Sequence, residues 1–484
     1  MEIPHQSLRV AFDAPATDIR RPVTSPWDGT RIATFDTATE DTVDRALDIA
    51  YGLFRDRDRW VPAEERIAIL QRLAEKMEAR AEDLAVQAAR EGGKPLVDSR
   101  IEVARAIDGI RNCTELLRNR HGIEVPMGIN AASNDHLAVT RHEPIGVVVA
   151  ISAFNHPLNL IVHQVGPAIA AGCPVIVKPA EDAPISCYDF VDMLHEAGLP
   201  PEWCQALVVH RLEVAEQLAT DPRVAFLTFI GSYRVGWMLR SRLAPGTRCA
   251  LEHGGAAPVI VTADADLEDA LPRLAKAGFY HAGQVCVSVQ RVFCERPIAR
   301  QVAERLAELG QGMKVGDPTL PDTDIGPLIR PREVERVHEW VQEAAAMGGE
   351  ILCGGQPVSE TAYAPTVILD PPQEARVSQQ EIFGPVICVY GYDDMDEALA
   401  RANALPFAFQ AAVFTKDIDR ALRAWRRFDA SAVMVNDTTA FRVDWMPFAG
   451  LKQSGLGTGG IPYTYEDMTV KKMLVIRSPE IGTR

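Results

Sequence analysis

Ile145-Gly-Val-Val-Val-Ala-Ile-Ser152 is the first of a series of short apolar runs, which continues at 174–178, 206–210 and 224–230. The runs are rich in β-branched residues and show no polar alternation, which is typical of strands buried on both faces of a parallel sheet. Helical segments separate them, at 157–171, 184–197 and 213–220. This alternation predicts a doubly wound α/β sheet.

Sheets of this kind bind ligands outside the carboxyl ends of their strands. Asn155, Lys178 and Gly231 each follow one of the apolar runs, so we expect them to share one edge of the sheet.

The rest of the chain extends this core in both directions. Residues 60–120 have the apolar spacing of helices, and a second series of strands and helices begins after Gly255, with strand-like segments at 258–261, 292–294 and 386–390. We therefore expect a second α/β domain. The strand-like pieces 123–143 and 464–484 have no core of their own, and 470–476 would leave an apolar edge strand exposed in a monomer.

Composition narrows the class of protein. The 484 residues are 47% hydrophobic, carry a formal net charge of -16 and contain no Lys/Arg block, which disfavours nucleic acid and anionic membranes as partners. No apolar run approaches the roughly 20 residues of a membrane span, and the start lacks a secretory signal, so we expect a cytoplasmic protein. The nine cysteines are scattered without a Cys-x-x-Cys pair, which argues against metal binding and disulfides.

Cys286 and Glu252 each stand in a glycine-marked setting, in His281-Ala-Gly-Gln-Val-Cys-Val-Ser288 and Leu251-Glu-His-Gly-Gly255. A thiolate can add to a carbonyl carbon, and a carboxylate can later activate the water that releases the acyl group. A lone cysteine between valines is more often a buried hydrophobe, so neither residue alone would be decisive.

Other motifs are individually weak. Gly231-Ser232 joins a strand to a helix, which allows phosphate to approach the helix N-terminus, yet the stretch is not a Gly-x-Gly-x-x-Gly fingerprint. Lys178 and Glu181 could be a simple surface charge pair.

Together the motifs resemble the aldehyde dehydrogenase superfamily, from about residue 20 to the end, and look most like its lactaldehyde dehydrogenase branch. The matching segments, in the expected order, are Glu143–Gly146, Phe154–Leu158, Val177–Glu181, Phe229–Ser232, Leu251–Gly255, Gly283–Cys286, Glu381–Val386, Pro447–Gly450 and Ser454–Gly455.

The resemblance implies specific roles. Cys286 would be the nucleophile, Asn155 with the Cys286 backbone N–H would hold the oxyanion, and Glu252 would activate the hydrolytic water. The expected cofactor is NAD, with NADP as the possible alternative, because the Glu181 carboxylate would repel a 2′-phosphate. The cofactor residues would be Lys178, Glu181, Gly231, Ser232, Glu381 and Phe383.

It also implies a domain plan. Residues 1–122 and 144–253 would form the NAD-binding domain, 254–446 the catalytic domain, and 123–143 with 464–484 an oligomerisation arm of a homodimer or homotetramer. Four positions depart from the common pattern: His253, Ala256, Ala449 and Gly459. The last puts any proton relay through that position in doubt.

The substrate is expected to be a small polar or α-hydroxy aldehyde, because His156, Asn159 and His163 lie near one helical face beside the implied substrate tunnel. These side chains could equally satisfy buried backbone groups. Phe441 is a candidate tunnel wall, and Arg442 is either an anion clamp, which would suit a semialdehyde, phosphonate or sulfonate aldehyde, or a surface partner of Asp444.

Three other functions remain open. A CoA-acylating dehydrogenase would share the fold and the thiol, but Glu252 favours water as the acyl acceptor. A cysteine hydrolase would not need the cofactor residues. A non-catalytic scaffold relative would not need Cys286, Glu252 and Asn155 together.

Overall fold

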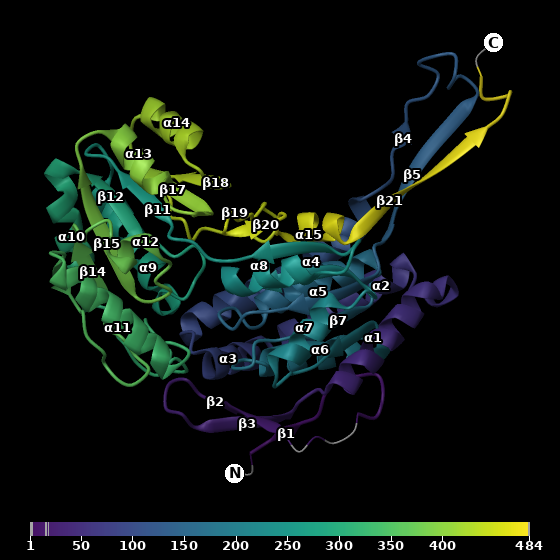
Figure 1. The fold of residues 1–484 in the computed structure, drawn as a ribbon, viewed down its shortest axis with the longest axis horizontal. Coiled ribbons are helices and arrows are strands. Elements are labelled where there is room, and N and C mark those ends of the chain that lie inside the picture. The colour runs from purple at the N-terminus through teal and green to yellow at the C-terminus, as the bar shows by residue number, and fades with distance from the viewer. Residues whose placement is uncertain (1–2, 15–16, 18, 483–484) are drawn as a thin grey trace.

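A computed structural model describes residues 3–14, 17 and 19–482. Two α/β bodies lie side by side, and a ribbon of strands projects from one of them (Figure 1). The doubly wound α/β fold expected from the sequence is confirmed. None of the helices within the described residues has the length and apolar character needed to span a bilayer.

The first body is built on a six-stranded sheet of order β20-β10-β9-β6-β7-β8. All its strands are parallel except the short β20. Their bounds are β6 Val147–Ile151, β7 Val175–Lys178, β8 Cys204–Ala206, β9 Val224–Ile230, β10 Arg248–Glu252 and β20 Gly455–Leu456. The strand expected at 206–210 is wrong in its bounds, because residues after Ala206 leave the sheet.

Helices cover both faces of this sheet, which is why its strands are apolar throughout. Along β6, Val148 and Ala150 pack into one hydrophobic core, whereas Val147, Val149 and Ile151 pack into the other. The helices that surround the sheet are α1 Glu40–Arg55, α2 Ala63–Ala79, α3 Ala81–Gly92, α4 Leu96–Asn119, α5 Asn159–Ala171, α6 Ile185–Glu196, α7 Leu212–Thr220, α8 Tyr233–Arg242 and α15 Ile461–Asp467.

A small three-stranded mixed sheet lies along the outside of this body (Figure 1). It consists of β1 His5–Gln6, β2 Arg20–Thr24 and β3 Arg31–Asp36, in the order β1-β3-β2.

The second body has a seven-stranded sheet of order β13-β14-β15-β12-β11-β17-β18, parallel except for β13. Its strands are β11 Pro258–Val261, β12 Arg291–Glu295, β13 Glu350–Cys353, β14 Thr366–Leu369, β15 Val386–Tyr392, β17 Gln410–Phe414 and β18 Ala432–Val435. Its helices are α9 Leu267–Phe279, α10 Arg296–Gln311, α11 Pro331–Ala346, α12 Arg376–Gln379, α13 Met395–Asn403 and α14 Ile418–Arg427.

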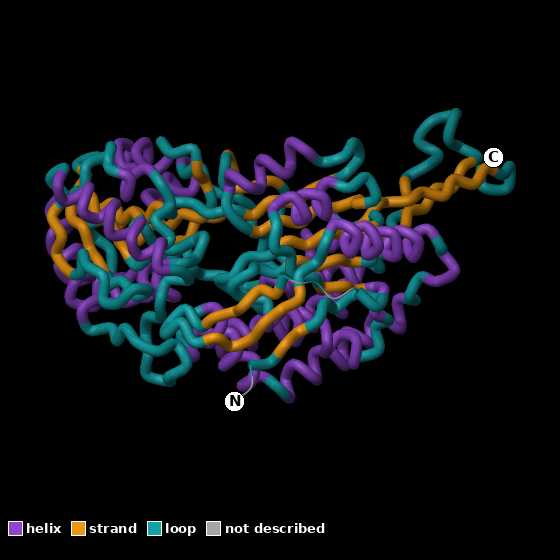
Figure 2. Tube along the Cα trace, turned by 60° about the horizontal axis from the view of Figure 1, so that its bottom comes forward, coloured by secondary structure: helices purple, strands orange, loops and turns teal. Residues whose placement is uncertain are grey.

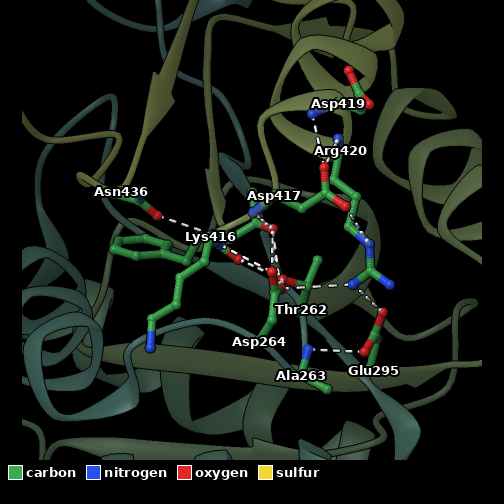
Figure 3. Close-up of polar contacts among 11 residues, drawn as sticks. Thr262, Ala263, Asp264, Glu295, Lys416, Asp417, Asp419, Arg420 and Asn436 are labelled. Carbon is green, nitrogen blue, oxygen red and sulfur yellow. Dashed lines mark hydrogen bonds and ion pairs between the residues drawn. The ribbon is translucent and has the colours of Figure 1, made fainter.

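Strand order in this sheet reverses between β11 and β17, a place where α/β sheets commonly bind ligands. Here the protein's own side chains fill the carboxyl ends of the strands (Figure 3). Thr262 donates to the Phe414 carbonyl at 3.0 Å, Asp264 accepts from the Lys416 backbone at 3.1 Å, and Arg420 donates to Glu295 at 3.1 Å.

The projecting ribbon contains β4 Glu124–Val125, β5 His136–Pro144 and β21 Thr469–Arg477 (Figures 1 and 2). β21 lies at the edge of this sheet, and its successive residues Met473, Leu474, Val475 and Ile476 are each 43–57% exposed. Because neighbours on a strand face opposite sides, both faces of the ribbon are uncovered. The expected strand-like segment 464–484 begins instead within α15, and residues 483–484 lie outside the described residues.

Candidate active site

A single cavity of about 1800 Å³ receives residues from both α/β bodies. Its walls include every site residue expected from the sequence: Asn155, His156, Asn159, His163, Lys178, Glu181, Gly231, Ser232, Glu252, Cys286, Glu381, Phe383, Phe441 and Arg442. A site for one small ligand typically measures roughly 300–1,000 Å³, so this cavity has room for two ligands end to end.

Cys286 lies between a short 3₁₀ turn, Tyr280–Gly283, and β12, at the amino-terminal edge of the second sheet. His281, Ala282 and Gly283 all adopt left-handed backbone, with φ of 48°, 54° and 71°. At Gly283 a Cβ would lie 2.0 Å from the Gly384 carbonyl oxygen, so this position requires glycine. Non-glycine residues in this region are costly and cluster at functional sites.

The thiol is protonated in this arrangement. Burial, with the nearby carboxylates of Glu381 and Glu252, raises the pKa of the Cys286 thiol to about 12. A nucleophilic thiolate therefore needs a change in its surroundings, such as a nearby cation or an acceptor for its proton.

Asn155 follows β6 and reaches the cysteine loop. Its side-chain amide donates to the Gln284 carbonyl at 2.9 Å, two residues before Cys286. Gln284 is fixed in turn, because its amide donates to the Pro327 carbonyl at 3.1 Å and its oxygen accepts from the Ile329 backbone at 2.9 Å. The Asn155 amide is therefore held against the loop that carries Cys286, and both residues line the cavity.

Glu252 ends β10 and lines the same cavity as Cys286. Burial raises the pKa of its carboxyl group, against the opposing charge of Arg442. A Cβ at Gly459 would lie 2.1 Å from the Glu252 Oε1 atom. The Glu252 carboxylate occupies the space that a side chain at position 459 would take.

The polar side chains on α5, Asn159 and His163, both contact the buried carboxylate of Asp444. Asp444 accepts from His163 Nε2 at 2.7 Å, from Asn159 Nδ2 at 3.2 Å, and from Arg105 through two hydrogen bonds of 2.7 and 3.0 Å. Burial alone would raise the pKa of Asp444, but the hydrogen bonds and charges of His163 and Arg105 hold it well below its usual range. Asn159 and His163 thus orient the segment around Asp444 and do not cap buried backbone.

Arg442 does not pair with Asp444, which corrects the surface-pair alternative. Its guanidinium carbon lies 3.5 Å from the centroid of the Phe448 ring, and its Nη1 atom is buried without a hydrogen-bond partner in the described residues. An unpaired buried donor is costly, and here it lies in the wall of the cavity that holds Cys286. Phe441 is 47% exposed at the same cavity.

The expected cofactor residues line the same cavity. Lys178 ends β7 and is buried, with its Nζ 3.5 Å from Glu181 Oε1. Gly231 and Ser232 follow β9 and precede α8, and the Ser232 side chain makes no capping hydrogen bond. Burial raises the pKa of Glu381 to about 8, although the Gly255 backbone donates to it at 3.2 Å.

These residues fit a dinucleotide. Glu381 is a buried carboxylate with spare acceptor capacity, as the hydroxyls of a ribose require, and a Cβ at Gly254 would lie 1.7 Å from its Oε1 atom. The helix N-terminus after Gly231-Ser232 suits phosphate. Lys178 and Glu181 at the distal end offer a cation and an acceptor to a second ribose.

Several supporting residues carry no local sequence motif. Lys94 and Glu102 form a fully buried ion pair of 2.6 Å, and Glu102 accepts from the Leu158 and Asn159 backbone N–H groups at 3.0 Å each. A carboxylate at a helix N-terminus is stabilising, so this pair fixes the start of α5 next to Asn155. The alternation of charged and apolar residues indicates the helix α4, which carries Glu102. It does not indicate that Glu102 pairs with Lys94.

His253, one of the four departures, has a definite contact. Its Nδ1 atom lies 3.0 Å from the Gly231 carbonyl, and burial lowers the pKa of its ring. The neutral imidazole therefore donates to the turn that faces the cofactor end of the cavity.

The sequence is similar to those of known aldehyde dehydrogenases. The model of the aldehyde dehydrogenase family matches residues 14–474. The chain is 38% identical over 439 residues to 3-sulfolactaldehyde dehydrogenase of Priestia aryabhattai, which covers 91% of each protein. It is 34% identical over 418 residues to lactaldehyde dehydrogenase of Methanococcus vannielii, covering 86% of this chain and 88% of that one.

Solved structures show the same architecture. An aldehyde dehydrogenase of Physcomitrella patens, solved in complex with the reaction product succinate, superimposes with a TM-score of 0.94 at 35% identity and covers 99% of both chains.

Proposed function

The chain belongs to the aldehyde dehydrogenase family, and on that premise we propose that it oxidises a small aldehyde bearing an anionic group to the carboxylic acid, with Cys286 as nucleophile and NAD as hydride acceptor. Membership makes it an NAD(P)-dependent oxidoreductase that acts on aldehydes, as the motifs predicted. The cysteine mechanism, the substrate class and the choice of NAD are the proposal.

In the first half-reaction, the Cys286 thiolate adds to the aldehyde carbon and the carbonyl oxygen becomes an alkoxide. The Asn155 amide and the Cys286 backbone N–H donate to this oxygen, which stabilises charge that develops only during the reaction. NAD, which Lys178, Glu181, Glu381 and Phe383 would hold, would supply the acceptor for the hydride that leaves this carbon. The acyl group then remains on sulfur as a thioester.

In the second half-reaction, Glu252 removes a proton from water as the water oxygen attacks the thioester carbon. The carbon–sulfur bond breaks, and the thiolate and the carboxylic acid separate. Burial raises the pKa of the Glu252 carboxyl group, which makes it a stronger base than an exposed glutamate. Water as acceptor distinguishes this chemistry from CoA acylation.

One observation carries the substrate class: the Arg442 guanidinium shares the cavity wall with Cys286 and has a buried Nη1 without a partner. The neighbouring carboxylate, Asp444, is already neutralised by Arg105. An anionic group on the substrate would supply the missing acceptor, and a guanidinium matches sulfonate and carboxylate oxygens in geometry. Similarity to the sulfolactaldehyde enzyme supports the same choice.

The test compares aldehydes of matched size with and without a negative charge. Succinate semialdehyde and 3-sulfolactaldehyde should exceed butanal and lactaldehyde in kcat/KM, read by NADH absorbance. Arg442→Met should remove that advantage, by roughly ten- to a hundredfold for a charge-assisted hydrogen bond, and should leave the neutral aldehydes nearly unchanged.

Arg273→Met is the matched control, because Arg273 also lines the cavity but already pairs with Asp269 at 3.1 Å. A wild-type preference for lactaldehyde, unchanged by Arg442→Met, would favour the neutral α-hydroxy aldehyde as substrate. Formation of acyl-CoA, or thioester hydrolysis without NAD, would refute the proposed reaction. A fold that bound aldehyde without any turnover would make the chain a scaffold relative.

A further inference from the structure

Glu181 is the acceptor that sets the cofactor choice in the proposed function, and it is not alone at the distal end of the cavity. Arg21, on β2 of the small outer sheet, has its Nη2 3.3 Å from Glu181 Oε2 and 3.7 Å from Asp182 Oδ1. The Arg21 Nε atom is buried and has no hydrogen-bond partner in the described residues. This arginine lies more than a hundred residues before the loop that it contacts.

The two carboxylates face three cations. Lys178 lies 3.5 Å from Glu181, Arg21 contacts both acids, and Arg330, just before α11 of the second body, forms an ion pair with Asp182. The formal charge of these five side chains together is therefore +1, although the whole chain carries a net charge of -16. Removing the carboxylate of Glu181 would raise the local excess to three cations against one acid.

Glu181 and Asp182 line the cavity, whereas Arg21 contacts them from the side of the outer sheet and is not itself part of the wall. The carboxylate thus stands between the guanidinium and the ligand. A 2′-phosphate on the adenosine ribose would meet the negative charge first.

We propose that Arg21 is a masked 2′-phosphate ligand: paired with Glu181 it fixes the carboxylate for NAD, and freed from Glu181 it becomes the residue that accepts NADP. The inference rests on the proposed placement of the adenosine ribose beside Lys178 and Glu181. A guanidinium binds phosphate through two parallel hydrogen bonds, and the orphaned Nε atom next to Nη2 offers the second donor.

Chain geometry supports this role over a purely structural one. A structural ion pair would satisfy the guanidinium, but here one donor stays unpaired and the contacts to Glu181 and Asp182 exceed 3.2 Å. Arg20, its neighbour on β2, is 62% exposed and its Nε lies 3.9 Å from Asp36. The strand therefore carries two arginines of which one alone faces the cofactor end.

The experiment is a double-mutant cycle on the full chain, with Glu181→Ser, Arg21→Met and the double variant. Dissociation constants for NAD, NADP and 2′-AMP are measured by titration calorimetry without any aldehyde, so that the readout is independent of turnover. Glu181→Ser should lower the dissociation constants for NADP and 2′-AMP roughly ten- to a hundredfold. Arg21→Met alone should leave the affinity for NADP unchanged or lower it, because the Glu181 carboxylate then faces the phosphate with Lys178 as its remaining counter-ion.

The double variant decides the matter. It should lose most of the gain seen in Glu181→Ser, and Arg21→Lys in the Glu181→Ser background should restore part of it, since lysine keeps the charge but not the two-pronged geometry. Arg20→Met in the same background is the control and should keep the full gain. Melting temperatures of all variants exclude loss of folding as the cause.

A double variant that binds NADP as tightly as Glu181→Ser would overturn the role of Arg21, as would a Glu181→Ser variant with no gain at all. Failure of the proposed function looks different, because in that case the wild-type protein would bind neither NAD nor NADP.

Discussion

Replacing Asp444 with asparagine should test whether the buried carboxylate shapes the substrate end of the cavity. Asp444 accepts four hydrogen bonds, from Arg105, Asn159 and His163, and is 2% exposed. Breaking a buried ion pair from one side costs about 3–5 kcal/mol. Asparagine keeps one acceptor oxygen, so we expect a loss near the lower end, about 3 kcal/mol.

The assay combines thermal unfolding with kinetics. A loss of that size lowers the melting temperature by about 6–12 °C for a domain of 150–250 residues. The segment that includes Arg442 and Phe441 should loosen, so KM for anionic aldehydes should rise while kcat changes little. Asp437→Asn is the control, because Asp437 lies on the same segment and lines the cavity but forms no ion pair in the described residues.

The stability difference should also depend on pH with a defined sign. The pKa of Asp444 is lowered in the folded state, so its contribution is present above the unfolded value of about 3.9 and is lost as pH falls towards the folded value. Wild type and Asp444→Asn should therefore converge below about pH 4. Equal melting temperatures and KM values at pH 7 for Asp444→Asn and Asp437→Asn would refute the reasoning.

The remaining predictions concern the thiol, the base and the ribbon. Cys286→Ala should abolish oxidation while NAD still binds by calorimetry, because the thiol forms the covalent intermediate and contributes little to cofactor binding; turnover by this variant would exclude the thiol. Glu252→Gln should give a stoichiometric burst of NADH without steady turnover, and an unchanged steady rate would exclude Glu252 as base. In the cofactor-free protein, alkylation of Cys286 by iodoacetamide should rise about tenfold per pH unit with no plateau up to pH 10, because the pKa of the thiol is raised to about 12; a plateau near pH 7 would contradict this. Light scattering should give at least a dimer for the intact chain, and deletion of 464–484 should dissociate or aggregate it, because both faces of the ribbon expose apolar residues; a stable intact monomer would rule this out.

The sequence predicts the sheet and its carboxyl-end residues well, because both depend on local pattern. Apolar runs without alternation correspond to β6 and β9; Gly231 follows β9 directly, and Asn155 lies four residues after the end of β6. The family motifs identify two further site residues, Cys286 and Glu381. The periodicity of apolar residues does not indicate that these two share a site. All of them line one cavity in the structure.

What the sequence does not predict are partners separated by long stretches of chain. Arg105 and Asp444 are 339 residues apart, and neither lies in a motif that names the other. The sequence predicts His156, Asn159 and His163 on one helical face, but α5 begins at Asn159 and His156 precedes it. The common partner of Asn159 and His163 is Asp444, which no helical spacing could reveal. The ends of strands are also predicted poorly, as at β8. Residues 207–209 stay buried, although the strand that pairs with β7 ends at Ala206.

Gly459 bears on the proposed role of Glu252 as a base. Any side chain at this position would occupy the space of the Glu252 Oε1 atom, since even a Cβ would lie 2.1 Å away and 3.1 Å from the Phe448 carbonyl oxygen. A side chain at position 459 would therefore require the Glu252 carboxylate to leave its present place. The charge that faces Glu252 is Arg442, which lowers its pKa against the effect of burial. In the proposed reaction, an anionic substrate bound to Arg442 would weaken that stabilisation and raise the basicity of Glu252.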